Sequence, residues 1–372
     1  MTEKLRVLFA IPSLDRDGPD RVMFELLTAL DRTRFVPSLL VSEPTGHYLS
    51  RLPADVAVTV LGTQDSLRTR YPFMAALRAV RRQAPDVVLA TLRMTYTLGL
   101  VAPAFPRHTR LVLRQANDFT TDFARLVDSG KLKHRIAKAL SLTALRRADA
   151  IVCQSEAMRA DLQAHLGEGP PLFAIGNPVD VDAVLAAATA ATPVLAGRPA
   201  LVAVGRLMAQ KGFDLLLPAI VEVRHEHPDL HLTILGDGPD RSELEAQTRR
   251  LDLERSVTFR GFSDQVLPQV RAADLFVLAS RYEGFPNAAL EALACGTPVV
   301  LTDCPGANVE IVIPGVNGRL ATAVEPHAVA VALATAIREL AGYDRTRITA
   351  DTRSRYAARR ITADYEAVLA RS

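Results

Sequence analysis

The chain alternates short apolar segments with longer amphipathic ones, and it runs through this alternation twice. The apolar segments are rich in Val, Ile and Leu, which is typical of parallel β-strands joined by helices. In the first half, strands are predicted over residues 5–11, 36–42, 56–62, 86–91, 110–115, 149–155 and 171–177. Amphipathic patterns such as 21–30 and 72–83 predict the connecting helices.

The alternation restarts after an Ala- and Thr-rich connection that contains Pro193 and Gly197. Further strands are predicted over residues 200–206, 230–238, 257–262, 275–280 and 298–303. We expect an α/β protein with two Rossmann-like, doubly wound domains, over 1–185 and 195–349, facing each other across a cleft. The Arg-rich helix predicted over 350–372 either braces the first domain or remains a solvated amphipathic helix.

The composition fits two ordinary hydrophobic cores. Of 372 residues, 49% are hydrophobic, and the net charge of +3 is too small to indicate nucleic-acid binding. Residues 1–190 hold 24 Lys and Arg against 19 Asp and Glu, whereas residues 191–372 hold 20 Lys and Arg against 22 Asp and Glu. The first half is therefore the basic half, which favours an anionic partner or a membrane surface there.

Cysteine usage and hydropathy bear on the compartment. The three cysteines, Cys153, Cys295 and Cys304, have neither CxxC pairing nor metal-ligand spacing, which fits small core residues in a reducing compartment. The N-terminal apolar run is too short for a signal peptide, and no uncharged run reaches the ~18 residues that span a bilayer. We expect a cytoplasmic protein that is able to contact the inner face of the plasma membrane.

Two cations follow the first strand of the second half. An apolar strand ends at Gly205, the loop carries Arg206 and Lys211, and Gly212 precedes a helix. A guanidinium fork, an ammonium group and oriented backbone amides at a helix N-terminus together suit a diphosphate. An ordinary charged loop between strand and helix is the alternative.

A glycine pair at 236 and 238 resembles a dinucleotide fingerprint only in part. The third glycine is absent, and Asp237 would repel a pyrophosphate. We interpret this loop as a tight turn, and the missing fingerprint argues against a nicotinamide-dependent dehydrogenase.

The stretch SRYEGFPNAALEALACGTPVV, residues 280–300, contains two glutamates eight positions apart. Glu283 lies on the loop after a predicted strand, whereas Glu291 lies in the helix that starts near Pro286 and ends at Gly296. A carboxylate at this edge of a sheet can accept hydrogen bonds from two vicinal hydroxyls, such as those of a ribose. Two solvated surface charges are the alternative, because short motifs also arise by chance.

Taken together, these motifs resemble glycosyltransferase family 4, the retaining glycosyltransferases of GT-B fold. The segments that carry the resemblance are EGFPNAALE, the VGRL and KG pair about 70 residues before it, IGNPVD at 175–180, and DLFVLAS through GVNGRL. The likeness is dense in the second half and loose in the first. It implies fold and donor class more specifically than the sugar that is moved.

The resemblance implies a role for each charged residue of the second half. Arg206 and Lys211 would bind the diphosphate of a nucleotide sugar and neutralise charge on the departing nucleoside diphosphate. Glu291 would bind the ribose hydroxyls, and Glu283 would face the donor sugar near the reacting carbon. These residues are the expected catalytic and donor-binding set.

The resemblance also implies donor contacts from neighbouring segments. The backbone amides of Phe285, Asn287 and Ala288 would lie beside the sugar hydroxyls or the distal phosphate. Arg260 and Phe262 would lie near the base. Neither a metal nor a cofactor is expected, because the two cations of the second half would do the work of a divalent ion.

The first half departs from the family pattern at two places. In the family's Gly-Gly segment one glycine is replaced by Asp17, so Gly18 is kept as a donor contact, with the carboxylate of Asp20 close behind. A histidine common in the family is absent, and Ala116 or Asn117 takes its place. Asn117 is a candidate acceptor contact, because its amide can bond sugar hydroxyls but cannot act as a base.

The remaining expectations concern acceptor and membrane. Loops 62–73 and 91–99 follow predicted strands and carry candidate acceptor contacts, above all Arg93 and Tyr96. The basic amphipathic segment 129–149 either packs as an ordinary surface helix or contacts an anionic membrane or a lipid diphosphate. The expected partners are a nucleotide sugar and a glycan or polyprenyl-lipid-linked acceptor, without nucleic acid.

These inferences favour a retaining, metal-independent glycosyltransferase. It would move a sugar from a nucleoside diphosphate sugar, UDP-linked rather than GDP-linked, onto a glycan or lipid-linked acceptor in cell-surface polysaccharide or glycoconjugate biosynthesis. One alternative is a catalytically idle nucleotide-sugar binder, suggested by the altered Gly18 loop and by Ala116. Another is a GT-B nucleotide-sugar epimerase, which the missing histidine disfavours.

Overall fold

The computed structural model shows two compact α/β units, Met1–Pro178 with Ala358–Ser372 (unit 1) and Val179–Ala357 (unit 2). It describes residues 3–15, 17–62, 72–121, 123, 132–191, 193–263 and 265–371, with the backbone alone at 132–134.

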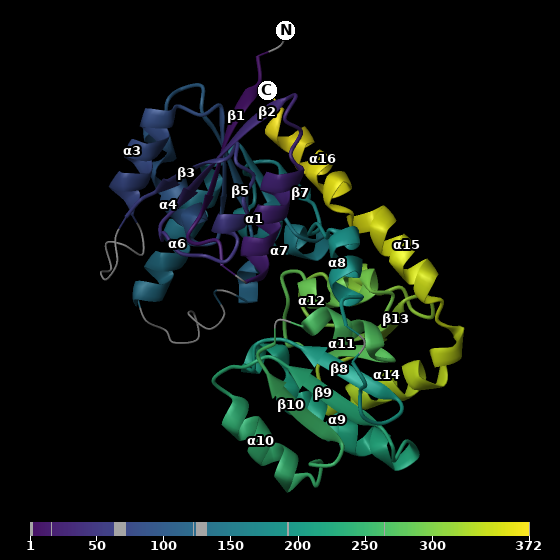
Figure 1. Ribbon diagram of the computed structural model, residues 1–372. Helices are drawn as coiled ribbons and strands as arrows, with labels where there is room; N and C mark the ends of the chain where they lie inside the picture. The colour runs from purple at the N-terminus through teal and green to yellow at the C-terminus, as the bar shows by residue number, and fades with distance from the viewer. Residues whose placement is uncertain are drawn as a thin grey trace. The chain divides into compact units, whose positions relative to one another are not determined.

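Unit 1 is built on a seven-stranded parallel sheet of order β3-β2-β1-β4-β5-β6-β7 (Figure 1). Its strands are β1 (Leu5–Ile11), β2 (Phe35–Val41), β3 (Ala57–Val60), β4 (Val87–Thr91), β5 (Arg110–Arg114), β6 (Ala150–Cys153) and β7 (Leu172–Ala174). Its α-helices are α1 (Gly18–Ala29), α3 (Phe73–Gln83), α4 (Arg93–Val101), α6 (Leu132–Arg146), α7 (Glu156–Leu166) and α16 (Ala358–Leu369). The central strands are buried on both faces, which explains their nearly continuous apolar sequences.

Unit 2 is built on a six-stranded parallel sheet of order β10-β9-β8-β11-β12-β13. Its strands are β8 (Ala200–Val204), β9 (His231–Leu235), β10 (Val257–Gly261), β11 (Leu275–Leu278), β12 (Val299–Thr302) and β13 (Gly318–Ala321). Its α-helices are α8 (Val181–Ala188), α9 (Phe213–Glu226), α10 (Arg241–Arg250), α11 (Val266–Ala272), α12 (Asn287–Ala294), α13 (Asn308–Ile311), α14 (Pro326–Arg338) and α15 (Arg345–Tyr356).

The strand order of each sheet reverses once. The reversal lies between β1 and β4 in unit 1 and between β8 and β11 in unit 2. Connections that leave two such strands diverge, which opens a crevice at their carboxyl ends, where doubly wound folds bind ligands. The predicted Gly18 and Arg93 follow β1 and β4, whereas Lys211 and Glu283 follow β8 and β11.

The units divide the chain at other positions than the predicted domains. Residues 179–185, expected in the first domain, belong to unit 2 because α8 buries Val181, Val184 and Ala188 and packs against α11 and α12. The predicted helix 350–372 is two helices, since Ala357 is extended (φ −53°, ψ 139°) and the Tyr356 carbonyl accepts the Val179 amide at 2.9 Å. Only α16, the second of them, belongs to unit 1.

Helix α16 packs beside α1 in unit 1 (Figure 1). It buries Ile361, Tyr365, Val368 and Leu369, and burial of one such apolar side chain contributes about 1.5–3 kcal/mol. Its Glu366 accepts the Asp31 amide at 2.7 Å. The C-terminal segment is therefore a structural part of unit 1.

Candidate active site

The loops that follow β8 and β11 meet through an ion pair between the partly exposed Lys211 and the buried Glu283. The Lys211 ammonium nitrogen lies 2.7 Å from Oε1 of Glu283, and the Ser280 hydroxyl donates to the same oxygen at 2.6 Å. Glu283 is 4% exposed, so its charge is held by these two donors rather than by water. The predicted catalytic pair is thus in direct contact, although 72 positions separate the two residues in the sequence.

Two glycines allow the chain to close around this pair. A Cβ atom on Gly212 would lie 1.8 Å from the Ala279 carbonyl oxygen, and one on Gly306 would lie 1.6 Å from that of Glu283. Both glycines have positive φ, at +64° and +129°, which other residues rarely adopt. The Glu283 amide also donates to the Pro305 carbonyl at 2.9 Å.

A second ion pair fixes the two loops to each other. Arg281 forms a bidentate contact with Asp214, with both N–O distances at 2.7 Å, and donates to the Ala209 carbonyl at 2.7 Å. The hydrogen bond from Arg281 lowers the pKa of Asp214. Bidentate arginine–carboxylate contacts restrict orientation as well as distance, so this pair sets the positions of Lys211 and Glu283.

Arg206 lies on the β8 loop with its side chain exposed. Within the described residues, its guanidinium makes neither a hydrogen bond nor an ion pair. The neighbouring Leu207 amide donates to Asp237 at 3.0 Å, and the Leu207 carbonyl accepts from Asp240 at 3.1 Å. The loop after β9 is therefore a turn that supports the Arg206 loop, and five donors of Arg206 remain available to a ligand.

The N-terminus of α12 lies directly after the Glu283 loop. Pro286 precedes the helix without a side-chain cap, and the side chain of Phe285 is buried. The Asn287 amide donates to the Phe285 carbonyl at 2.9 Å, so this predicted donor contact is already engaged. Ala288 lies in the uncapped first turn, and Glu291 lies one turn further with a partly exposed side chain.

The two residues predicted near the base lie elsewhere on the sheet of unit 2. Arg260 belongs to β10, an edge strand that β9 separates from β8, and its side chain is exposed. Phe262 follows the same strand and is 65% exposed. An aromatic ring this exposed at a carboxyl edge presents surface of the kind on which bases stack.

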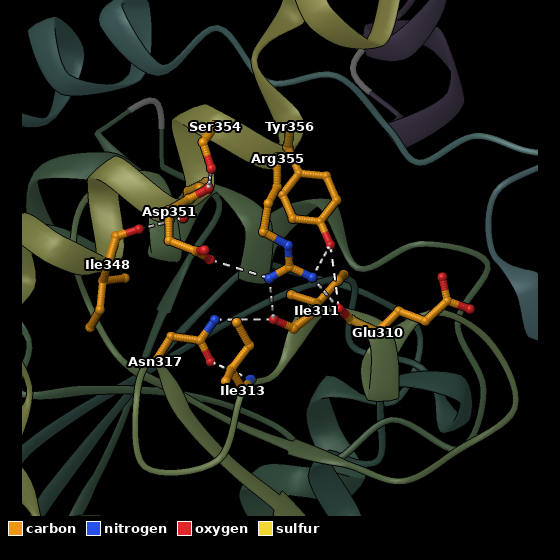
Figure 2. Close-up of polar contacts among 10 residues, drawn as sticks. Glu310, Ile311, Ile313, Asn317, Ile348, Asp351, Ser354, Arg355 and Tyr356 are labelled. Carbon is orange, nitrogen blue, oxygen red and sulfur yellow. Dashed lines mark hydrogen bonds and ion pairs between the residues drawn. The ribbon is translucent and has the colours of Figure 1, made fainter. Parts of the chain in front are cut away.

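Contacts between α13 and α15 support the segment that hydrogen-bonds to the Glu283 loop. The chain passes from Pro305 into α13, whose last carbonyls accept hydrogen bonds from Arg355 at the end of α15 (Figure 2). Arg355 also lies 3.2 Å from Asp351 and 2.9 Å from the Tyr356 hydroxyl. Cationic side chains at a helix C-terminus satisfy carbonyls that have no partner within the helix.

In unit 1 the predicted acceptor residues gather at one cavity. Arg93, Tyr96 and Asn117 line a cavity of about 200 Å³, together with Ala116, which stands where the family histidine is expected. Leu92 precedes them with φ +55°, a strained conformation for a leucine that costs on the order of 1–3 kcal/mol. Such strain is typical of functional loops, which supports a ligand-binding role for this cavity.

Two arginines at this cavity have N–H donors or positive charge that their protein neighbours satisfy only in part. Arg93 contacts Glu43 at 2.6 Å, but its Nε atom is buried and has no hydrogen-bond partner among the described residues. Arg114 is fully buried and donates to neutral groups, Asn177 Oδ1 at 2.7 Å and the Tyr365 hydroxyl at 3.1 Å.

Sequence reasoning missed Arg114. The one available signal was an arginine at the end of an otherwise apolar strand segment, RLVLR. A buried cation with neutral partners favours an anion nearby.

The first-half donor candidate lies at the start of a helix. Gly18 is the first residue of α1, and Asp20 in the same turn is 2% exposed and accepts the Asp15 amide at 2.8 Å. Burial raises the pKa of Asp20 to about 7. Asp20 therefore binds the loop back onto the helix, whereas Gly18 is partly exposed at the first position of the helix.

The described residues contain no group of three or more His, Cys, Asp and Glu side chains arranged to hold a metal ion. Among them, no helix is both long and apolar enough to cross a bilayer. The cysteines are free and buried, as predicted. Residues 63–71 of the first acceptor loop and 129–131 of the basic segment lie outside the described residues.

Known proteins share both halves of this architecture. Residues 16–183 match the family described as Glycosyltransferase Family 4, and residues 198–342 match Glycosyl transferases group 1. The structure of Anabaena HepE in complex with UDP superposes with a TM-score of 0.77 at 20% identity, covering 98% of this chain and 99% of that one. The two parallel sheets therefore define the GT-B fold, as predicted.

Relatives with curated names agree with this class. Lipopolysaccharide core biosynthesis glycosyltransferase LpsE of Rhizobium meliloti is 33% identical over 165 residues, 44% of this chain and 47% of LpsE. A Campylobacter jejuni N-acetylgalactosamine-N,N'-diacetylbacillosaminyl-diphospho-undecaprenol 4-alpha-N-acetylgalactosaminyltransferase is 26% identical over 298 residues, 79% of each chain. Other curated relatives align over 24% or 55% of their length. The chain belongs to glycosyltransferase family 4.

Proposed function

We propose that the protein is a retaining glycosyltransferase that uses a nucleoside diphosphate sugar, UDP-linked in preference to GDP-linked. Its product is a glycan or lipid-linked glycan of cell-surface polysaccharide or glycoconjugate biosynthesis. The observation that carries the proposal is the partly buried Lys211–Glu283 pair at the strand reversal of unit 2, with the exposed Arg206 on the same loop as Lys211. The UDP in the HepE structure supports the choice of nucleotide.

The proposed reaction places the two cations on the leaving group. Arg206 and Lys211 bind the diphosphate and stabilise the charge that develops as the bond between the anomeric carbon and the phosphate oxygen breaks. The acceptor hydroxyl oxygen bonds the same face of that carbon, and its proton passes to the departing phosphate oxygen. This route needs no protein base, which is consistent with Ala116 in place of a histidine.

The carboxylates have separate roles in this scheme. Glu291 accepts hydrogen bonds from the ribose hydroxyls, and Glu283 faces the donor sugar while it holds Lys211 in place. Phe262 stacks on the base and Arg260 lies beside it. The cationic pair supplies the charge compensation, and the reaction is proposed to be metal-independent.

The acceptor is proposed to carry an anionic group that enters the cavity of unit 1. The orphaned Nε of Arg93 and the buried Arg114 supply cationic donors, and Tyr96 and Asn117 supply groups for sugar hydroxyls. A lipid-linked sugar diphosphate has both features. The Campylobacter relative, named for a diphospho-undecaprenol acceptor, supports this class of acceptor.

Such an acceptor implies contact with a membrane surface from the cytoplasmic side. On α6, Ile136 is 51% exposed and Leu140, one turn later, is 48% exposed. Arg135 and Lys138 lie on the same two turns. An exposed apolar pair with basic neighbours suits the headgroup region of an anionic bilayer, so α6 is the proposed peripheral contact.

The experiment that tests the proposal measures nucleotide release from UDP- and GDP-sugars by the purified protein, with and without lipid-linked acceptors. Slow hydrolysis of one donor, lost in Lys211→Ala and in Glu291→Ala, supports transfer. Tight donor binding without turnover, with every donor and acceptor tried, would instead favour a catalytically idle nucleotide-sugar-binding protein. Conversion of the donor into another nucleotide sugar would indicate the epimerase.

A further inference from the structure

Unit 2 contains a second cavity, of about 590 Å³, that shares no lining residue with the Lys211–Glu283 site. Four elements contribute to it: Leu185 from α8, Arg271 from α11, Cys295 after α12, and one face of α15. The α15 face supplies Arg345 and Arg353. We call it the arginine cavity.

The lining of the arginine cavity is cationic. It includes three arginines and neither aspartate nor glutamate. Arg353 is paired with Asp182 at 2.7 Å. Within the described part of unit 2, Arg271 and Arg345 form no ion pair, although the charge of Asp274 acts on Arg345 from beyond contact distance.

Neutral backbone groups hold these two guanidinium groups in place. Arg345 donates to the Arg271 carbonyl at 2.6 Å and to the Ala273 carbonyl, and Arg271 approaches the Cys295 carbonyl at 3.4 Å. Burial lowers the pKa of Arg345. Each guanidinium carries five N–H donors, so most remain available on rigidly placed cations, which is the arrangement that recognises a tetrahedral oxyanion.

The rest of the wall suits a small organic body. Leu185 and Ala350 offer apolar surface, and the hydroxyls of Thr346 and Ser354 lie on the α15 side. The volume falls in the range of about 300–1,000 Å³ that small-molecule sites occupy. We propose that the arginine cavity binds a phosphate monoester, with the phosphate on Arg271 and Arg345 and the organic part against α8 and α15.

The absence of tryptophan from the chain provides a local reporter. Ser354 lines the cavity and is exposed, so Ser354→Trp places a single tryptophan at its rim. Titration with glucose 6-phosphate at constant ionic strength should give a saturable fluorescence change, and inorganic phosphate should compete for it. Glucose, which lacks the anion, should give none.

Matched variants test whether the arginines are responsible. In the Ser354→Trp background, Arg271→Gln should weaken binding at least about tenfold. Arg347→Gln should leave it unchanged, because Arg347 is exposed on α15 and lies outside the cavity lining. A response to glucose equal to that for glucose 6-phosphate, or affinity retained in Arg271→Gln, would overturn the proposal.

Calorimetry on the chain without the reporter separates this cavity from the proposed donor site, which also suits phosphates. Binding of glucose 6-phosphate should persist in Arg206→Ala/Lys211→Ala and weaken in Leu185→Trp, which narrows the cavity on the α8 side. Heat that disappears with the donor-site variant and survives Leu185→Trp would show that the phosphate binds elsewhere. The proposal stands independently of the transferase activity, since it requires only that unit 2 is folded.

Discussion

The Nζ atom of Lys211 lies 2.7 Å from Oε1 of Glu283, and the two residues occupy loops that leave β8 and β11. These strands are neighbours at the point where the strand order reverses. The ion pair therefore lies where doubly wound folds bind ligands, and it connects the cation proposed for the leaving group to the carboxylate proposed for the sugar.

Removing Lys211 should lower kcat/KM by more than about 30-fold, equivalent to about 2 kcal/mol of transition-state stabilisation. The ammonium group is proposed to act on charge that develops only as the donor bond breaks. Initial rates of Lys211→Met and wild type with the preferred UDP-sugar measure the effect. Lys4→Met, at an exposed site, should retain wild-type rates.

Lys211→Met also leaves Glu283 buried without its ion pair, so lost activity alone could reflect lost stability. The double variant Lys211→Met/Glu283→Gln removes both charges. It should regain thermal stability relative to Lys211→Met while remaining inactive. Recovery of activity together with stability would contradict the catalytic role of Lys211.

Glu291 is expected to recognise the ribose. Glu291→Gln keeps the size of the side chain but removes the charge, which weakens hydrogen bonds from the vicinal hydroxyls by about 1–3 kcal/mol. The measurement compares KM for a UDP-sugar and its 2′-deoxyuridine analogue in both proteins. Wild type should have a lower KM for the ribose donor than for the deoxy analogue, and Glu291→Gln should not. Equal discrimination in both proteins would contradict recognition of the ribose by Glu291.

The alternation of apolar runs predicted the parallel strands, because strands buried on both faces have continuous apolar sequences. Strand order is a tertiary property, so the sequence alone could not place Lys211 against Glu283. Gly212 and Gly306 fit there only because the Ala279 and Glu283 carbonyls come so close. The hydrogen bond from the Asn287 amide to Phe285 could not be predicted, because it depends on local backbone angles that no side-chain pattern reveals.

The two missed cation sites share one physical reason. Arg114 and Arg345 look like ordinary surface charges in sequence, yet one is fully buried and the other donates to backbone carbonyls. Burial of an arginine depends on neutral partners from distant segments, such as Tyr365 for Arg114. The same limit applies to α15 and α16, whose shared Arg-rich pattern hides the break at Ala357.

Burial of Asp20 should make stability depend on pH. Because its pKa is raised to about 7, the folded state keeps the proton over a range where the unfolded chain has released it. Stability from this group is therefore fully present below the ordinary pKa and declines as pH rises towards 7, by at most about 1.4 kcal/mol per pH unit.

Urea unfolding of wild type and Asp20→Asn at a series of pH values between about 4.5 and 8 measures this dependence. The variant should flatten the decline. Asp31→Asn is the control, because hydrogen bonds from Thr33 lower the pKa of Asp31, so its contribution changes only at more acidic pH. A decline unchanged by Asp20→Asn would assign it to another group.

Arg355 should matter more than its exposed neighbour Arg353. Arg355→Met removes hydrogen bonds to the last carbonyls of α13, behind the loop that contacts Glu283 (Figure 2). The Glu310 carbonyl keeps the Tyr356 hydroxyl and the Ile311 carbonyl keeps the Asn317 amide, so the loss is that of the hydrogen bonds from the guanidinium, about 1.5–3 kcal/mol. We expect kcat to fall several-fold as that loop loosens. Arg353→Met breaks a surface pair with Asp182, which is worth about 0–1 kcal/mol. Urea unfolding measures the stability of both variants, and initial rates measure their activity. Equal losses in Arg355→Met and Arg353→Met would contradict the supporting role of Arg355.

Membrane contact through α6 predicts that Ile136 and Leu140 act together with anionic lipid. Each exposed side chain would bury apolar surface in the headgroup region, and the basic residues beside them would add an attraction that salt screens. Sedimentation with vesicles of phosphatidylglycerol and phosphatidylcholine should show binding that weakens with salt. Ile136→Ser/Leu140→Ser should reduce it at least about tenfold, since loss of two apolar contacts exceeds 1.4 kcal/mol.

Val331→Ser, at a 53% exposed valine on α14, is the matched control and should bind as wild type does. Binding that survives the double substitution would show that the membrane contact lies on a surface other than α6.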